Sequence, residues 1–307
     1  MQNLTLKQLR YFEALSRHRH FGRAADDCAI SQPAMSMQIR DLEAALGVPL
    51  VERAARQVRL TGFGEELAGR AAAILREVDE LGDLARSSQK RLAGRLRLGV
   101  IPTVAPYLLP RVIGRLTERY PRLDIHIRET VTPNLLGELA EGRLDTAIVA
   151  LPVSEPSLEE VALFDESFVL VRPGAEAGTP APSADTLREM RLLLLEEGHC
   201  FRDQALSFCK LDAAPPREML DASSLSTLVQ MVSAGIGVTL IPEMAVQVET
   251  RSAGVALSHF APPRPKRTIG MVWRRSTPLS EQLDQMAEVV REAGRGRASE
   301  GDQPHFE

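Results

Sequence analysis

The sequence lacks the features of a membrane or secreted protein. No uninterrupted apolar segment approaches the ~20 residues that cross a bilayer, and the N-terminus lacks the basic-then-apolar pattern of a signal peptide. We therefore expect a cytoplasmic protein without membrane contact. Cysteine is also scarce, with three residues in 307. In a reducing compartment this argues against a structural disulfide framework and for thiol chemistry or none.

A strong excess of charge of one sign is absent as well. The formal net charge is −4, so the whole chain is no polycation and any nucleic-acid contact must be local. A chain of 307 residues is too long for one ordinary domain, and 44% apolar residues provide enough material for two or three cores.

Two of the three cysteines lie in one polar segment, residues 196–209. Cys200 follows Gly198-His199 and an apolar run at 192–195, which predicts a strand, a loop and then a helix. A helix start carries free backbone N–H groups and partial positive charge, which stabilise a thiolate. His199 and Arg202 would add to this effect if they face the sulfur, so Cys200 is the candidate nucleophile.

The second cysteine, Cys209, has a different setting. It shares an apolar helical stripe with Phe201 and Ala205, where a cysteine is usually an inert small hydrophobe. If residues 201–209 are helical, the Cα atoms of the two cysteines lie roughly 13 Å apart, about twice the ~7 Å limit for a disulfide. The thiols can then bond only if the helix unwinds, and oxidation of Cys200 to sulfenic acid would drive that change. The alternative is two unrelated packed thiols.

Residues 1–60 have the pattern of a winged helix-turn-helix. After two short helices, a third is predicted at residues 32–46, because Ser31 is a good N-cap and Pro33 suits the first turn. Polar side chains at four-residue spacing share its outer face and can reach base edges and phosphates. The candidate DNA-contacting residues of this helix are Ser31, Gln32, Pro33, Ser36 and Arg40.

The segment after this helix carries the local positive charge. Residues 1–61 hold nine Lys/Arg against six Asp/Glu, a balance of 9 − 6 = +3. Arg53, Arg56 and Arg59 cluster where Val58 and Leu60 alternate with polar residues, which predicts a β-wing lying along phosphates. A surface helix with a few polar residues is common, and this basic context is what favours DNA binding.

Residues 61–90 predict a long linker helix without internal breaks until Ser87-Ser88. Apolar residues at alternating steps of four and three form a heptad seam typical of a dimer interface: Leu67, Ala71, Ile74, Val78, Leu81 and Ala85. A two-fold partner would supply the second DNA half-site. The alternative is a helix packed on its own protein, because alanine at two seam positions makes a weak coiled coil.

From residue 91 onwards strands alternate with helices, which predicts a parallel α/β architecture. The expected strands are 96–100, 123–127, 146–151, 168–171, 192–195, 237–241 and 269–273. The last strand and a helix at 278–293 return to the first region. We therefore expect a two-lobed domain at 91–293, with lobe I at about 91–164 and 268–293 and lobe II at about 165–267. The polar residues 294–307 are predicted to be disordered.

Several segments resemble the hydrogen-peroxide-sensing members of the LysR-type transcriptional regulators, and the resemblance covers about residues 4–293. The redox segment of that family is similar to Gly198-His199-Cys200-Phe201-Arg202-Asp203-Gln204-Ala205 followed by Phe208-Cys209. Further matches are Ile101-Pro102-Thr103-Val104, residues 106–110, Leu163-Phe164-Asp165-Glu166 and Arg267-Thr268-Ile269-Gly270. Ser31-Gln32-Pro33-Ala34-Met35-Ser36 resembles the family's recognition helix, but Met37 stands where many relatives have a polar or basic residue.

The resemblance implies a fold and a set of site residues. The fold is a winged helix-turn-helix, a linker helix and a periplasmic-binding-protein-like effector domain. Cys200 would attack peroxide and be captured by Cys209 as a reversible disulfide. The positions that bind peroxide or water beside the thiol would be Thr103, Thr132, His199 and Arg267.

From the residues alone, other roles remain open for these side chains. Thr103 and Thr132 follow strand ends and are ordinary helix-cap candidates. Arg202 and Asp203 are expected to pair with each other or to order the loop. An alternative role for His199 is to orient the thiolate without proton transfer.

The resemblance also implies the partners. These are promoter DNA, a homotetramer built as a dimer of dimers, RNA polymerase, and a glutaredoxin- or thioredoxin-like reductant. One hydrogen peroxide is consumed per switch, so we expect an activator of the oxidative-stress response and no enzyme, metal or cofactor.

Two alternatives stay open. A LysR-type regulator for a small organic acid would need anion-binding donors in the cleft and would be indifferent to alkylation of Cys200. A thiol peroxidase would need sustained turnover without DNA affinity, which the helix-turn-helix and heptad segments argue against.

Overall fold

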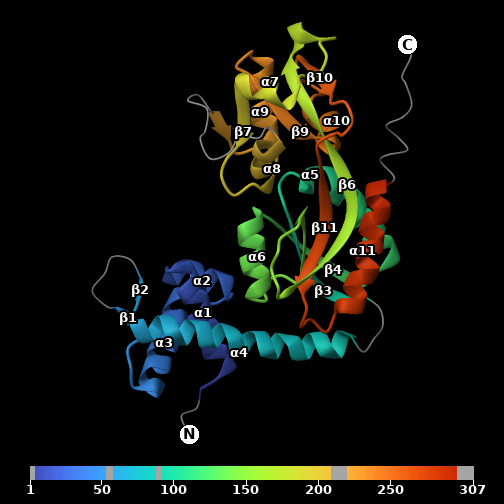
Figure 1. Cartoon of the computed structure of the whole chain (residues 1–307). Helices are drawn as coiled ribbons and strands as arrows, with labels where there is room; N and C mark the ends of the chain where they lie inside the picture. Colours follow the sequence, from blue (N-terminus) through green and yellow to red (C-terminus); the bar gives the residue numbers. More distant parts are fainter. Residues whose placement is uncertain (1–3, 53–57, 88–91, 209–219, 296–307) are drawn as a thin grey trace. The chain divides into compact units, whose positions relative to one another are not determined.

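The computed structural model describes residues 4–52, 58–87, 92–208 and 220–295 of the 307-residue chain (Figure 1). The chain divides into two compact units, residues 1–85 and 86–307, each with its own hydrophobic core. Of the predicted tail, residues 294 and 295 end the last helix, and residues 296–307 lie outside the described ranges. No helix in these ranges is both long and apolar enough to cross a bilayer.

The first unit is the predicted winged helix-turn-helix followed by a long helix. Its elements are α1 (Leu6–His18), α2 (Phe21–Asp27), α3 (Gln32–Leu46), β1 (Val51–Glu52), β2 (Arg59–Leu60) and α4 (Gly62–Ser87). The predicted bounds of α3 are confirmed. Ser31 caps its first turn by accepting a hydrogen bond from the Ala34 N–H at 3.4 Å, and Gly47 ends it with a left-handed φ of 72°.

One carboxylate fixes the wing to the end of α3. Glu43 Oε1 accepts hydrogen bonds from the backbone N–H groups of Leu50, at 2.7 Å, and Val51, at 3.1 Å. The Leu50 side chain is fully buried between the helices, and Val51 pairs with Leu60 across the two antiparallel strands. The direction in which the wing leaves α3 is therefore fixed by the Glu43 hydrogen bonds to the backbone and by the buried Leu50 side chain.

The second unit contains one nine-stranded sheet with the order β4-β3-β5-β11-β6-β9-β7-β8, and β10 pairs with β6. The strands are β3 (Gly94–Val100), β4 (Leu123–Glu129), β5 (Thr146–Leu151), β6 (Leu158–Pro173), β7 (Leu192–Leu195), β8 (Leu220–Ala222), β9 (Val238–Pro242), β10 (Val255–His259) and β11 (Lys266–Arg274). The helices are α5 (Ala105–Arg119), α6 (Thr132–Ala140), α7 (Ala184–Glu189), α8 (Cys200–Phe208), α9 (Leu225–Ser233), α10 (Val246–Glu249) and α11 (Ser280–Arg295), with short 3-10 turns η1 (Gly174–Glu176) and η2 (Glu243–Ala245).

The expectation of a parallel sheet is wrong for part of this unit. Strands β3, β4 and β5 are parallel, and β7 is parallel to β8 and β9, but β6, β10 and β11 run antiparallel to their neighbours. The predicted strand at 168–171 is one part of the 16-residue β6. Helix–strand alternation identifies crossover units, but it does not show that β6 and β11 pass from one half of the domain to the other.

These two long strands join the predicted two lobes. Residues 158–167 of β6 pair with β11 beside β5, and residues 168–173 pair with β9 and β10. Lobe I thus holds β3, β4, β5 and the helices α5, α6 and α11, lobe II holds β7–β10 and α7–α10, and β6 and β11 connect the two (Figure 1). A polar contact also joins the lobes: the Tyr107 hydroxyl of α5 donates to Glu249 Oε1 of α10 at 2.6 Å, and Ser226 of α9 donates to the other carboxylate oxygen at 2.6 Å.

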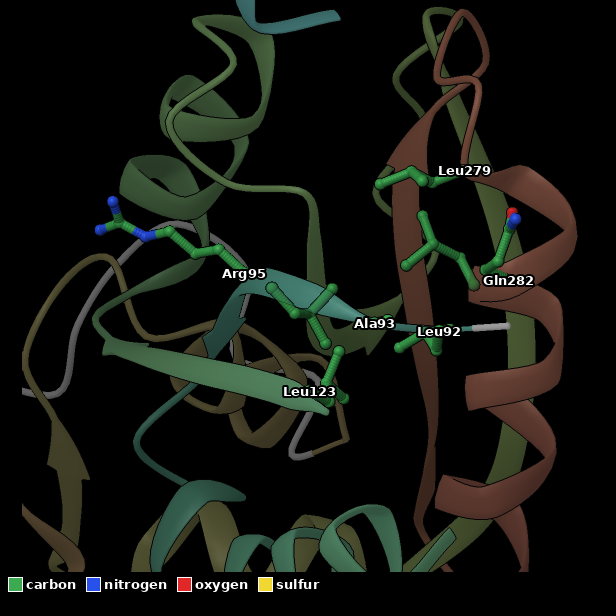
Figure 2. A pocket seen from close by; sticks show the side chains of 8 residues that line it. Leu92, Ala93, Arg95, Leu123, Leu279 and Gln282 are labelled. Carbon is green, nitrogen blue, oxygen red and sulfur yellow. The ribbon is translucent and has the colours of Figure 1, made fainter. Parts of the chain in front are cut away.

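A small cavity near the start of β3 carries no candidate site. Figure 2 shows that mainly leucine side chains surround it, from β3, β4 and the start of α11. Its volume of about 20 Å³ is room for about one water molecule.

Glycine at position 270 is a steric requirement of the strand that joins the lobes. A Cβ atom there would overlap the Leu151 side chain and lie 2.9 Å from the Val161 carbonyl oxygen. We expect Gly270→Ala to lower the free energy of unfolding by about 1–3 kcal/mol through overpacking. The matched control is Gly114→Ala in α5, where nothing lies within 4 Å of the added atom, and it should be neutral or stabilising by up to about 1 kcal/mol.

Denaturant titration followed by the fluorescence of Trp273, the single tryptophan, measures both variants. Equal midpoints for Gly270→Ala and the parent would contradict this account.

Candidate functional site

The predicted setting of Cys200 at a helix start is confirmed. Strand β7 ends at Leu195, Gly198 takes a φ of +91° that favours glycine, and Cys200 is the first residue of α8. Its thiol is free and partly buried. The N–H groups of the first turn direct partial positive charge toward this end of the helix, the arrangement that favours a thiolate.

A cavity of about 550 Å³ lies beside Cys200, between the lobes. Lobe II contributes Gly198, Cys200 and Asp203. Lobe I contributes one face of α6 and the loop before β6: Thr132, Pro133, Leu136, Gly137, Ala140, Glu155, Ser157 and Leu158. The cysteine therefore faces a space that a small molecule can enter, with mostly apolar walls and few polar groups.

Thr132 stands out among the lining residues. It is the first residue of α6, but the N-cap position belongs to Val131 and no side chain caps the helix, so the helix-cap interpretation of Thr132 is wrong. Its Oγ1 atom is buried and has no hydrogen-bond partner among the residues that the structure describes. A buried hydroxyl without a partner costs about 1–3 kcal/mol, which a small hydrogen-bonding ligand or water would relieve.

Thr103 and Arg267 lie together in a second, fully enclosed group. Arg267 donates from Nη1 to Thr103 Oγ1 at 2.8 Å and from Nη2 to the Thr103 carbonyl oxygen at 3.1 Å. Thr103 does not cap α5 either, because Val104 holds that position without a side-chain hydrogen bond. Among the described residues, the cavity beside Cys200 is lined by Thr132 but not by Thr103, His199 or Arg267.

Glu166 completes this group, and the sequence pattern assigned it no role. Its Oε2 accepts from Arg267 Nε at 2.9 Å, and its Oε1 accepts from the backbone N–H of Met244 at 2.9 Å. The guanidinium and carboxylate are almost inaccessible to solvent, at 0% and 4% exposure. The Arg267 guanidinium also lies 5.2 Å from the ring centroid of Phe201, the residue that follows Cys200.

The neighbours of Cys200 differ from the expectation of two flanking cations. Burial lowers the pKa of the His199 imidazole, and the Glu196 carboxylate opposes this shift only in part, so His199 is neutral at neutral pH. Arg202 donates from Nη1 to the Leu195 carbonyl oxygen and to Asp221 Oδ1, both at 2.7 Å. It does not pair with Asp203, which is exposed; instead Arg202 ties the start of α8 to β7 and β8.

The other two cysteines are placed differently. Burial, together with the Asp27 carboxylate, raises the pKa of the Cys28 thiol in the first unit, which keeps it protonated. Cys209 follows the last residue of α8 and lies outside the described residues. The predicted helix between the cysteines is nevertheless present, from Cys200 to Phe208.

The candidate DNA-contacting residues lie on and around α3. Gln32, Pro33 and Arg40 are exposed, and Ser36 is half-buried. Arg40 Nε donates to the Ser36 carbonyl oxygen at 3.3 Å, so its guanidinium stays beside the outer face of the helix. Arg53 and Arg56 lie outside the described residues, whereas Arg59 is exposed on β2.

The seam predicted on α4 is partly uncovered in the single chain. Ile74 and Leu81 are 45% and 67% exposed, whereas Ala71 is fully buried. An apolar row of this kind on a helix of 26 residues is typical of a surface that another copy covers.

Comparison with known proteins identifies the class. Residues 6–65 match the model of the bacterial regulatory helix-turn-helix protein, lysR family, and residues 89–295 match the LysR substrate binding domain. The chain therefore belongs to the LysR family of DNA-binding transcriptional regulators, which confirms the predicted fold and the prediction of a regulator rather than an enzyme.

Within this class the similarity is closer to one group. The chain is 46% identical over 298 residues, 95% of each chain, to a probable hydrogen peroxide-inducible genes activator of Streptomyces viridosporus. It is 43% identical to the DNA-binding transcriptional dual regulator OxyR of Escherichia coli, covering 94% of this chain and 95% of the relative. A cysteine variant of Corynebacterium glutamicum OxyR, solved with H2O2 bound, has a TM-score of 0.67 and 36% identity over 99% of this chain and 98% of that one. The chain is a member of the OxyR family.

The lowered pKa of His199 predicts a pH dependence of stability. The unfolded chain binds the imidazole proton near the ordinary value of about 6.5, whereas the folded chain binds it only at lower pH, so stability falls as pH decreases through about 6.5. His199→Gln removes the imidazole and with it the stability that its protonation costs. The denaturation midpoint of this variant should therefore fall less between pH 7 and pH 5.5 than that of the parent.

His259→Gln is the control, because His259 is exposed on β10, away from the cavity lining. If the denaturation midpoint changes with pH equally in His199→Gln and in the parent, the lowered pKa of His199 is contradicted.

Proposed function

We propose that this protein senses hydrogen peroxide through Cys200 and converts its oxidation into a change of DNA binding. The observation that carries the proposal is the position of Cys200, at the N-terminus of α8 and in the wall of the cavity beside the unpartnered hydroxyl of Thr132. The family comparison points the same way, since relatives are described as peroxide-inducible gene activators and one was solved with H2O2 bound.

The first chemical step is a two-electron oxidation of sulfur. The Cys200 thiolate attacks one oxygen of H2O2, the O–O bond breaks, and the leaving hydroxide takes a proton to become water. Cys200 becomes a sulfenic acid. In this proposal the Thr132 hydroxyl hydrogen-bonds the bound peroxide, the enclosed Thr103–Arg267 group supports the site from behind Phe201, and His199, next to Cys200 in the chain, acts on the thiol side.

The second step links sulfur chemistry to the fold. The Cys209 thiol attacks the Cys200 sulfenic acid, a disulfide forms, and water leaves. Eight residues lie between the two cysteines, all of them in helix α8, so α8 must unwind before the sulfurs meet. Two edge-to-face ring contacts hold the helix at its ends: Phe201 with Phe168, at 4.9 Å, and Phe208 with Phe260, at 5.0 Å. Disulfide formation competes with these contacts, which makes α8 a bistable element.

The cavity argues against the organic-acid alternative. Its described lining contains two carboxylates, Glu155 and Asp203, and neither a lysine nor an arginine. A carboxylate ligand would meet like charge there, without the cationic donors that such a ligand needs. An uncharged peroxide meets no such barrier.

The assembly and the partners belong to the same proposal. Ser31, Gln32, Pro33, Ser36, Arg40, Arg53 and Arg56 contact promoter DNA, and α4 pairs two copies along its seam. Two such dimers form a homotetramer that recruits RNA polymerase when oxidised, and a glutaredoxin- or thioredoxin-like protein reduces the disulfide. The protein works in the cytoplasm, where its DNA lies.

The cysteines should separate by role. Cys200→Ser removes the nucleophile, so peroxide should give no sulfenic acid at position 200 and no transcriptional response. Cys209→Ser should still form the sulfenic acid, detected with a dimedone-type probe and mass mapping, but should give a weaker response and more sulfinic acid, since nothing captures the intermediate.

Cys28→Ser is the matched control and should respond as the parent does. A full peroxide response in Cys200→Ser would overturn the proposal.

Dimerisation through α4 is tested by charge. Ile74→Asp with Val78→Asp places two carboxylates in the seam and should lower the oligomer mass and weaken operator binding at least about tenfold, because a desolvated like charge faces its copy. Arg76→Asp, half a turn away on the same helix, is the control and should keep the mass. Mass photometry and gel-shift titration give both readouts, and an unchanged mass in the double variant would exclude this interface.

A further inference from the structure

We propose that Glu155 and Asp203 act as an electrostatic filter that lets uncharged peroxides reach Cys200 and holds back anionic oxidants. This inference rests on the proposed function, because it names the class of substrate that the same cavity admits. The two residues approach Cys200 from opposite lobes: Glu155 lies in the loop between β5 and β6, and Asp203 lies in the first turn of α8.

Both carboxylates are free to act on an incoming molecule. Each is exposed, and neither side chain has a hydrogen-bond or ion-pair partner among the residues that the structure describes. An unpaired carboxylate repels an anion in the cavity with its full charge. In a paired carboxylate the charge of the partner would cancel most of this repulsion.

Three cations around Cys200 and Asp203 are already paired. Arg202 is held by Asp221 at 2.7 Å, and Arg267 is held by Glu166 at 2.8 Å. Lys266 borders the neighbouring cavity on the other side of Asp203, and its ammonium group pairs with Asp165 at 2.5 Å. Each of these pairs sums to about zero charge, so the formal charges in the described lining are those of Glu155 and Asp203.

The expected size of the effect follows from Coulomb's law. In water-like surroundings one unit charge about 8–10 Å away lowers the local concentration of a monovalent anion about twofold, so two charges lower it about fourfold. Salt with a Debye length near 3 Å, as at 1 M, should remove most of this difference. Hydrogen peroxide is neutral, so its entry is unaffected.

The test compares two alkylating reagents of nearly equal size, neutral iodoacetamide and anionic iodoacetate. The rate of each at Cys200 is measured by mass mapping in the full chain, for the parent, for Glu155→Gln with Asp203→Asn, and for Asp284→Asn. Asp284 is an exposed carboxylate of α11 outside the cavity lining, so it controls for a change of net charge. The ratio of the two rates cancels any change in the thiolate fraction of Cys200.

The ratio of iodoacetate to iodoacetamide rates should rise about fourfold in the double variant at low salt, and the rise should largely vanish at 1 M salt. Asp284→Asn should leave the ratio unchanged. The peroxymonosulfate anion and hydrogen peroxide, compared in the same way, should show the same shift. An unchanged ratio in the double variant, or an equal rise in Asp284→Asn, would overturn the filter.

Sulfenic acid formation at Cys200 of the parent, followed in the same samples, separates the two claims. If Cys200 forms the sulfenic acid while the ratio stays constant, only the filter is wrong. If Cys200 does not react with hydrogen peroxide, the proposed function is wrong. The filter then no longer explains which oxidant the protein senses.

Discussion

The buried ion pair between Arg267 and Glu166 is the constraint on which the geometry of the site depends. It joins the two strands that pass between the lobes, and its hydrogen bonds extend to Thr103 of lobe I and to the backbone of Met244 in lobe II. Removing one partner of such a pair leaves an uncompensated buried charge, which costs about 3–5 kcal/mol. The same guanidinium lies over the ring of Phe201, so the second residue of α8 is held against this fixed group. The position of Cys200 in the cleft is therefore set by contacts that lie outside the cavity itself.

The rest of α8 is held much less strongly. Its contacts in the described range include one edge-to-face ring pair near each end and the link from Arg202 to Asp221, each worth about 0.5–3 kcal/mol. A covalent sulfur–sulfur bond can outweigh contacts of this size, while the ion pair behind Phe201 stays in place. This contrast gives a physical reason for a switch confined to one segment, with a rigid frame that transmits the change to the rest of the domain.

Local signals predicted a large part of this structure. Ser31, Pro33 and Gly47 define α3 because caps and breakers act within one turn, and Gly198 after the apolar run at 192–195 predicted the start of α8 at Cys200. The missed features depend on partners far apart in the chain. Glu166 meets Arg267 across 101 positions, and Arg202 meets Asp221 across 19 rather than its neighbour Asp203. The antiparallel course of β6 and β11 has the same cause, since strand direction depends on pairing across the domain and not on local alternation.

The central claim is that oxidation of the cleft cysteine changes how the helix-turn-helix contacts DNA. The most direct measurement is a DNase footprint of the same promoter fragment with reduced protein and with protein treated with one equivalent of hydrogen peroxide. The account predicts that the protected segment differs in position or length between the two states and returns to the first pattern after thiol reduction. Identical footprints in both states, with Cys200 shown to be oxidised in the second, would contradict it.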